Sequence, residues 1–129
     1  MRLSGLRRTT IRLPLIVFWT VLLFALRLSV FPVRFFSRTV EQALRAALFK
    51  AWGRVTIRLL GGRLWVLGDV PKPPFLLVTN HLSYVDIIVS AAVTGTTFVA
   101  KREIASWPFI GFCAKCLETL FIGRNDLRD

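Results

Sequence analysis

An uncharged apolar run near the N-terminus limits what this chain can fold into more than any other feature. Residues 13–26 carry no charge, but a membrane-spanning helix needs about 20 apolar residues. Extending the run through Arg27 to Val33 reaches a spanning length and places one arginine inside, unless its side chain reaches the head groups. Both flanks are basic, which fits a helix that dips into the bilayer or lies shallow as well as one that crosses it. A signal peptide fits less well, because Arg27 interrupts the place where a cleavage site would follow.

The charge of the chain is concentrated in its first 60 residues. They contain eleven Lys or Arg and one acidic residue, Glu41, and so hold +10 of the +11 net charge. Such a basic region can bind nucleic acid or an anionic membrane surface. Here the arginines alternate with large aliphatic and aromatic residues, whereas nucleic-acid-binding arms present exposed charge with little apolar bulk. We therefore expect membrane lipid, and not nucleic acid, as a partner.

Residues 38–60 are predicted to form a basic amphipathic helix. Apolar residues recur there at helical spacing, Pro32 separates the segment from the apolar run, and Gly61-Gly62 ends it. A helix of this kind is typical of an anionic membrane interface. An ordinary surface helix packed on the domain core is the alternative. We favour the membrane and assign residues 1–60 to a membrane-associated helical region.

From residue 61 onward, short apolar segments alternate with helical ones. We expect strands at 63–67, 75–79, 97–100 and 120–122, and helices at 85–93 and 103–117, the second interrupted by Pro108 and Gly111. Strands alternating with helices predict an α/β fold. Residues 61–129 would then form part of a sheet flanked by helices.

The only histidine of the chain lies at the end of a predicted strand. His81 is followed five positions later by Asp86, in the first turn of a predicted helix. At such a corner Asp86 could accept a hydrogen bond from one ring nitrogen of His81, leaving the other nitrogen to act as a general base on a hydroxyl. Ser83 offers a simpler interpretation, because Ser83 and Asp86 also match a capping box. The two roles are compatible.

Cys113 and Cys116 form a C-x-x-C pattern inside a predicted helix. A metal site needs four ligands, and the sequence contains no second cysteine pair and no spare histidine. A redox pair would stand directly after a strand. We therefore predict buried, inert cysteines, no metal site and a reducing, cytoplasmic setting.

The segment Asn80-His81-x4-Asp86 after an apolar strand resembles the first signature of the glycerol-phosphate and lysophosphatidate acyltransferase family. Phe98-Val99-Ala100-Lys101, Glu103-Ile104 and Trp107-Pro108-Phe109-Ile110-Gly111 resemble the segment that follows it there. Phe121-Ile122-Gly123-Arg124 resembles the second signature, although Gly123 stands where the family usually has Asp. The resemblance covers residues 59 to 124, and its ordered matches are more specific than any single motif.

This resemblance implies an acyltransferase that moves a fatty acyl group from a thioester to the hydroxyl of a lysophospholipid such as 1-acylglycerol-3-phosphate, in phospholipid biosynthesis. His81 and Asp86 would be catalytic. Arg124 would bind the lipid phosphate. Lys101 would be a second basic group near the substrate, with a plain surface lysine as the alternative. The co-substrate would be acyl-CoA or acyl carrier protein, with no further cofactor. The enzyme would lie at the inner membrane with its active site on the cytoplasmic side.

The third family signature, a Pro-Glu-Gly-Thr type turn, does not occur in the sequence. We therefore expect the chain to be the N-terminal part of a longer protein, with little or no activity by itself. Two alternatives remain open. One is an acyltransferase for another lysolipid, such as lyso-ornithine lipid. The other is a non-catalytic membrane-binding fragment in which His81 has no role.

Overall fold

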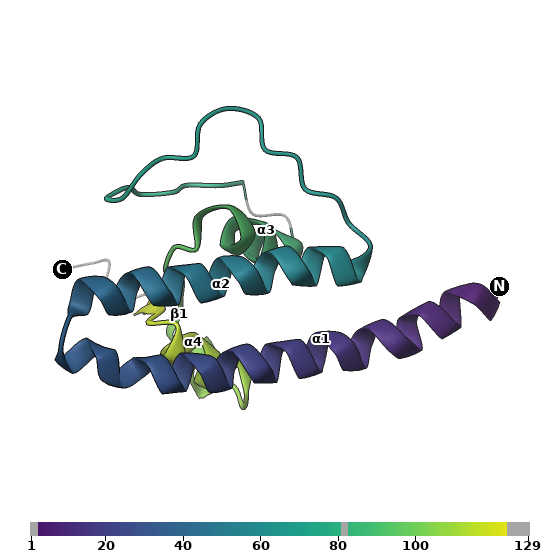
Figure 1. Ribbon diagram of the computed structural model, residues 1–129, viewed down its shortest axis with the longest axis horizontal. Coiled ribbons are helices and arrows are strands. Elements are labelled where there is room, and N and C mark those ends of the chain that lie inside the picture. The colour runs from purple at the N-terminus through teal and green to yellow at the C-terminus, as the bar shows by residue number, and fades with distance from the viewer. Residues whose placement is uncertain (1–2, 81–82, 124–129) are drawn as a thin grey trace.

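A computed structural model describes residues 3–80 and 83–123, and Figure 1 shows its arrangement. Two long helices, α1 and α2, lie side by side, and α3 packs on the opposite side of α2 from α1. A two-stranded sheet and α4 complete the fold. In chain order the elements are α1 (Leu3–Val30), η1 (Phe31–Phe35), α2 (Arg38–Leu60), α3 (Val85–Thr94), β1 (Val99–Lys101), η2 (Arg102–Ser106), α4 (Ile110–Cys116) and β2 (Leu120–Ile122).

The uncharged run 13–26 lies within α1, which ends at Val30, and Pro32 lies in the first turn of the 3-10 helix η1, so the break falls where the sequence predicts it. Residues Thr10–Phe35 are long and apolar enough to cross a membrane, and 11% of their most apolar window is buried. Most of this apolar surface therefore contacts no other part of the described protein. Helical backbone can carry such a surface because its hydrogen bonds are satisfied within the helix.

Helix α2 has the predicted bounds, and both of its ends are capped. Ser37, with extended backbone, accepts a hydrogen bond from the backbone N–H of Val40 through its side chain. Gly61 adopts φ 85° at the other end, where its N–H and that of Gly62 bond to carbonyls of the last turn. Such a left-handed cap suits glycine and turns the chain back across the helix end.

Helices α2 and α3 approach each other closely because small residues line their contact. A Cβ on Gly53 would lie 2.5 Å from the backbone nitrogen of Ala92 and 2.7 Å from the carbonyl oxygen of Ile88. Ala91 and Ala92 are buried. Gly95, at φ 65°, ends α3 against the carbonyl oxygen of Ala46. The two helices therefore run antiparallel, with the first turn of α3 beside the last turns of α2.

Strands β1 and β2 pair in parallel, with Val99 opposite Leu120 and Lys101 opposite Ile122. The strand predicted at 120–122 has the observed bounds, and the one predicted at 97–100 begins two residues later. The interrupted helix predicted at 103–117 is divided, as expected around Pro108, into η2 and α4. Helices with a small parallel sheet are consistent with part of an α/β fold.

The strands predicted at 63–67 and 75–79 are wrong for this structure. Residues 62–80 contain no strand and run as an open loop above α3 in Figure 1. Leu67, Leu76 and Val78 are 96%, 86% and 84% exposed. A strand, unlike a helix, bonds its backbone to a neighbour. These segments have the composition of strands but lie beside no neighbouring strand among the described residues.

Arg27, the charge that interrupts the apolar run, is buried within the protein. It is 4% exposed, and its Nη2 lies 2.6 Å from Oε1 of Glu41, itself 2% exposed. Arg27 Nε also donates to the carbonyl of Cys116 over 3.1 Å. The arginine therefore ties α1 to α2 and to the end of α4.

Glu118 extends this network at the surface. Its carboxylate lies 2.8 Å from Arg34 Nη1, 3.4 Å from Arg45 Nη1 and 4.0 Å from Arg27 Nη2. Its backbone has φ 57°, a strained value for a residue with a side chain. The three arginines surround the Glu118 carboxylate. Their positions in the sequence did not predict this contact.

Candidate active site

The corner before α3 holds Asp86 in place. Its Oδ2 accepts a hydrogen bond of 2.7 Å from the backbone N–H of Ser83, while Ser83 Oγ accepts one of 3.2 Å from the N–H of Val85. The contact of the Asp86 carboxylate with the Ser83 N–H is one half of the predicted capping box, but Tyr84, and not Ser83, is the N-cap of α3, and the Ser83 hydroxyl bonds to the N–H of Val85. The carboxylate is thereby fixed at the start of α3, beside the backbone of a residue two positions from His81.

Two of the predicted site residues, His81 and Arg124, lie outside the described residues. Lys101 is exposed at the end of β1, where the parallel register places it opposite Ile122. The structure therefore brings Lys101 to the segment 121–123 that begins the second signature. Their roles in catalysis and phosphate binding remain predictions.

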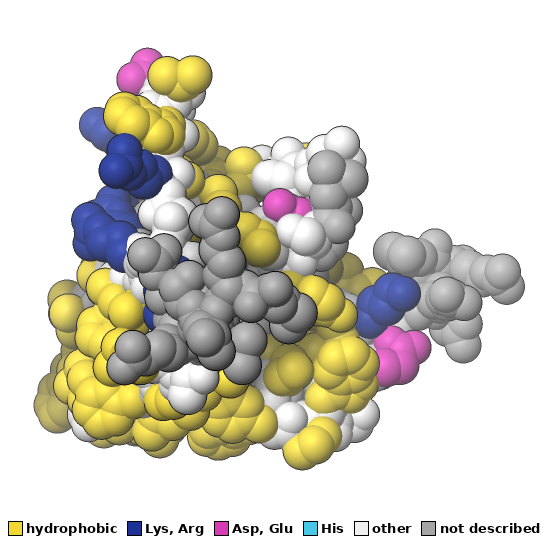
Figure 2. Space-filling model, turned by 90° about the vertical axis from the view of Figure 1, so that its right-hand side faces the viewer, with side chains coloured by type: hydrophobic (Ala, Val, Ile, Leu, Met, Phe, Trp, Pro, Cys, Tyr) yellow, Lys and Arg dark blue, Asp and Glu magenta, His cyan; other side chains and the backbone are white. Residues whose placement is uncertain are grey.

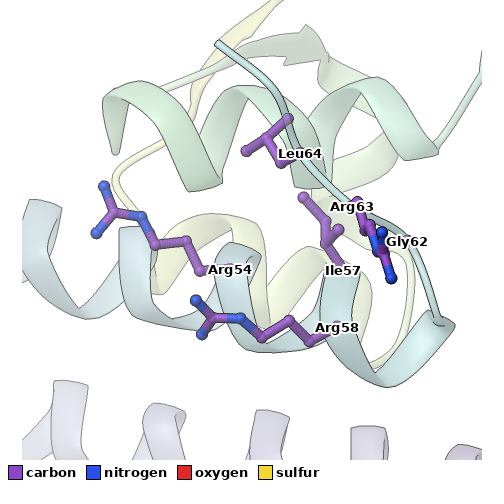
Figure 3. Close-up of a pocket in the computed structure, with 6 residues that line it drawn as sticks. All are labelled: Arg54, Ile57, Arg58, Gly62, Arg63 and Leu64. Atoms are coloured by element: carbon purple, nitrogen blue, oxygen red, sulfur yellow. The ribbon is translucent and has the colours of Figure 1, made fainter.

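A cluster of arginines near the end of α2 was missed as a site by sequence reasoning, which placed Arg54 and Arg58 on a basic amphipathic helix and Arg63 in a strand. A cavity of about 310 Å³ is bounded there by α2 and the segment after it (Figure 3). Its lining residues are Arg54, Ile57, Arg58, Gly62, Arg63 and Leu64. The four-residue spacing of Arg54 and Arg58, followed by a glycine turn and a third arginine, is the signal that could have revealed it.

The two cysteines are free and half-buried in and near the last turns of α4. Burial, with a smaller contribution from the neighbouring Cys116, raises the pKa of Cys113 to about 11. Burial also raises the pKa of Cys116, against the opposing effect of Arg27. Since the thiolate is the reactive form, both cysteines are poor nucleophiles at neutral pH. This supports the predicted inertness, although neither side chain is fully buried.

The surface separates apolar and basic side chains. In Figure 2 the lower part of the face, at the level of α1, is mostly hydrophobic, and Lys and Arg side chains gather in a column at the upper left. Exposed apolar side chains on α1 include Ile11, Leu15, Phe18, Val21 and Leu28. The molecule therefore presents an apolar side along α1 and a basic side above it.

Comparison with known proteins identifies a family model and several relatives that are similar to this chain. A family model described as Acyltransferase matches residues 65–129, which include the corner at Ser83–Asp86 and both strands. The chain is 35% identical over 109 residues to a lyso-ornithine lipid O-acyltransferase of Rhizobium meliloti (strain 1021), covering 84% of this chain and 37% of that protein. It is 35% identical over 116 residues to a protein of the same name from Brucella abortus (strain 2308), covering 89% and 42%.

A second kind of relative is similar over a shorter length. The chain is 39% identical over 79 residues to a 1-acyl-sn-glycerol-3-phosphate acyltransferase of Neisseria meningitidis serogroup B, covering 60% of this chain and 31% of that protein. The chain thus spans about two fifths or less of these relatives. No solved structure matches it. The family match over half of its length, on the segment that carries the candidate site, shows that the chain belongs to the acyltransferase family.

Proposed function

We propose that this chain is the N-terminal part of a membrane enzyme that transfers a fatty acyl group from a thioester to the free hydroxyl of a lysolipid. The acyl donor would be acyl-CoA or acyl carrier protein. Family membership and the relatives' names support the reaction class. The observation in the structure that carries the proposal is the position of Asp86, fixed at the start of α3 by the Ser83 N–H.

In the proposed reaction His81 is the general base. It takes the proton from the lysolipid hydroxyl, whose oxygen forms a bond to the thioester carbonyl carbon. The C–S bond then breaks, and the leaving thiolate receives the proton back from the imidazolium. Asp86 orients the imidazole and stabilises its charged form. Because the Ser83 N–H already holds the Asp86 carboxylate, less conformational entropy is lost when the carboxylate orients His81 during the reaction.

Two lysolipids are candidates for the acyl acceptor. The share of the chain that each kind of relative matches favours one of them. The relatives named lyso-ornithine lipid O-acyltransferase match 84% and 89% of the chain, including much of the helical region. The relative named 1-acyl-sn-glycerol-3-phosphate acyltransferase matches 60%. We therefore propose lyso-ornithine lipid as the first acceptor to test and 1-acylglycerol-3-phosphate as the second.

The exposed apolar side of α1 supports a membrane location for the enzyme. Such a helix can lie in the interface with its apolar face among the acyl chains, and basic residues above it attract anionic head groups. Glu41 neutralises Arg27 within the protein, so this arginine does not oppose burial of α1 in lipid. We propose that the active site faces the cytoplasm, where acyl thioesters are available.

The decisive experiment measures acyl transfer by the full-length protein with His81→Ala and Asp86→Asn. Loss of a general base lowers rates by about 10²–10⁴-fold. Asp69→Asn, which removes the same charge from the exposed loop, is the matched control and should leave the rate unchanged. Equal rates for wild type and His81→Ala would reject the catalytic proposal and favour a membrane-binding fragment.

The acceptor is tested with lysolipids that carry or lack a phosphate. If Arg124 binds the phosphate, Arg124→Ala should raise KM for 1-acylglycerol-3-phosphate and leave KM for lyso-ornithine lipid nearly unchanged. An equal effect on both acceptors would contradict that assignment. The wild-type ratio of kcat/KM for the two lysolipids ranks them directly.

A further inference from the structure

The arginine cavity at the end of α2 is built by a specific turn. Gly61 and Gly62 both return hydrogen bonds to the last turn of α2, which reverses the chain. After the reversal, Leu64 lies above α2 and the Arg63 side chain lies beside Gly62 at the end of the helix, while Arg54 and Arg58 extend from α2 itself (Figure 3). Three arginines therefore line one cavity, together with Ile57 and Leu64.

This cavity has an excess of positive charge. The four ion pairs found among residues 3–80 and 83–123 involve Arg27, Arg34 and Arg45, and none of the three cavity arginines. Arg54 is held by a 3.1 Å hydrogen bond from its Nε to the carbonyl of Ala92. Arginines that line one cavity without an ion pair to any described carboxylate favour binding of an anion, and their planar donors suit phosphate oxygens.

A fourth arginine adds to the charge near the turn. Arg12, on α1, donates from Nη1 to the carbonyl of Leu60 over 3.3 Å. Its guanidinium lies 2.9 Å from the position that a Cβ on Gly61 would occupy. The glycine turn is therefore enclosed by positive charge on the α1 side as well.

The cavity lies at the same end of the α2–α3 pair as the candidate active site. Gly53 opposes Ile88 and Ala92, and Gly95 opposes Ala46, so the helices are antiparallel. Asp86, in the first turn of α3, therefore lies toward the end of α2 that carries Arg58. A ligand whose phosphate occupied the cavity could extend its remaining chain toward the corner at Ser83–Asp86.

The ligand approaches from the side away from the apolar face. None of the lining residues that the structure describes comes from α1, and in Figure 3 the ribbon of α1 runs below α2, apart from the labelled side chains. A lysolipid would enter from the membrane, along α1. A water-soluble substrate would enter from the opposite side, where the arginines are exposed.

We infer that this cavity binds the phosphate of the 4′-phosphopantetheine arm of the acyl donor, a group that coenzyme A and acyl carrier protein share. The inference rests on the proposed acyl transfer. The phosphate is separated from the thioester by the flexible pantetheine chain. A site near the catalytic corner, but not at it, therefore matches the ligand.

The test compares Arg58→Gln/Arg63→Gln with Arg38→Gln in the full-length protein. Arg38 is an exposed arginine at the opposite end of α2, so its substitution removes similar charge away from the cavity. Binding of coenzyme A and of pantetheine, which lacks the phosphate, is measured by calorimetry in detergent. Flotation with phosphatidate vesicles is measured in parallel. Arg58→Lys/Arg63→Lys keeps the charge and removes the planar fork.

The double glutamine variant should weaken coenzyme A binding about tenfold or more, the effect expected when charge-assisted hydrogen bonds are lost. Arg38→Gln should bind like wild type, the lysine variant should be intermediate, and pantetheine should bind equally weakly to all. KM for acyl-CoA and for acyl carrier protein should rise with little change in kcat. Circular dichroism and the lysine variant separate this result from misfolding.

Unchanged coenzyme A binding and unchanged KM for both donors in the glutamine variant would overturn the inference. So would a loss of phosphatidate vesicle binding with normal coenzyme A binding, which would identify a lipid head-group site instead. Coenzyme A binding is read without turnover. If the glutamine variant binds coenzyme A normally while His81→Ala is inactive, only the phosphate site in the cavity is rejected. If His81→Ala is active, the proposed acyltransferase function itself is rejected.

Discussion

Helix α1 and the loop of residues 62–80 both expose large apolar side chains, but for different physical reasons. Phe18 on α1 is 66% exposed, and Leu76 in the loop is 86% exposed. The helix satisfies its backbone hydrogen bonds internally, so its apolar surface can exist in lipid without a protein partner. The loop does not, so its strand-like sequence needs a neighbouring strand. Exposure of apolar residues thus fits the lipid contact that we propose for α1, whereas in the loop it accompanies the lack of a neighbouring strand among the described residues.

Hydrogen exchange should show the largest difference between the two regions. In detergent-solubilised chain, central backbone amides of α2 should exchange at least about a thousandfold more slowly than those of residues 64–80, because only the former are in a packed helix. Mass spectrometry of peptides from each region measures this. Comparable protection of residues 64–80 would mean that the predicted strands form, so the loop would not differ from the helices as described. Protection of these residues only in the full-length protein would show that they pair with strands supplied from outside this chain.

The ion pair that anchors α1 to α2 gives the next largest effect. Glu41→Gln leaves the buried Arg27 without its close counter-charge, and breaking such a pair costs about 3–5 kcal/mol of unfolding free energy. Denaturant unfolding in detergent, followed by circular dichroism, is the measurement. Glu118→Gln is the control, because its carboxylate is one-third exposed and the expected loss is about 1 kcal/mol or less. Equal losses of unfolding free energy for Glu41→Gln and Glu118→Gln would show that the buried ion pair contributes no more to stability than the exposed one.

Membrane binding tests the assignment of lipid to α1 alone. Phe18→Asp places a charge on its apolar side and should weaken vesicle binding by about 2.5–3.5 kcal/mol if that side enters the hydrocarbon. Leu76→Asp puts the same charge on the exposed loop and should leave binding nearly unchanged. Flotation with neutral vesicles measures both. A similar loss for Leu76→Asp would mean that the loop also contacts lipid.

The contact between α2 and α3 should give the smallest of these effects. Gly53→Ala would bring a Cβ to 2.5 Å from the Ala92 nitrogen, so the helices must move apart. Such overpacking typically costs about 1–3 kcal/mol, against a gain of about 1 kcal/mol from the higher helix propensity of Ala. Thermal unfolding should therefore show a modest net loss. If Gly53→Ala is more stable than wild type, α2 and α3 can move apart at little cost in free energy.

Gly68→Ala is the matched control in the loop. Gly68 has φ 88° with no atom within 4 Å of an added Cβ. Its substitution should cost only local backbone strain and leave the α2–α3 contact intact. A larger loss there than at Gly53 would reverse the ranking of the two regions.

The sequence by itself predicted the helices well. Helix α2 has the predicted bounds because its signals are local: apolar spacing, Ser37 before its first turn and Gly61 after its last. The same holds for the break at Pro32 and for the contact between the Asp86 carboxylate and the Ser83 N–H. The ordered motifs around His81 also indicated the acyltransferase family before the comparisons showed it.

Only the tertiary structure decided what depends on distant partners. The segments 63–67 and 75–79 have strand composition, yet a strand requires a neighbour that local sequence does not specify. Likewise, Arg27 and Glu41 are 14 positions apart with a helix break between them, so their pairing follows from how α1 and α2 pack. The arginine cavity arises only when the turn at Gly61 lays Arg63 beside α2. Local signals fix helices and caps, whereas pairing and cavities are set by packing.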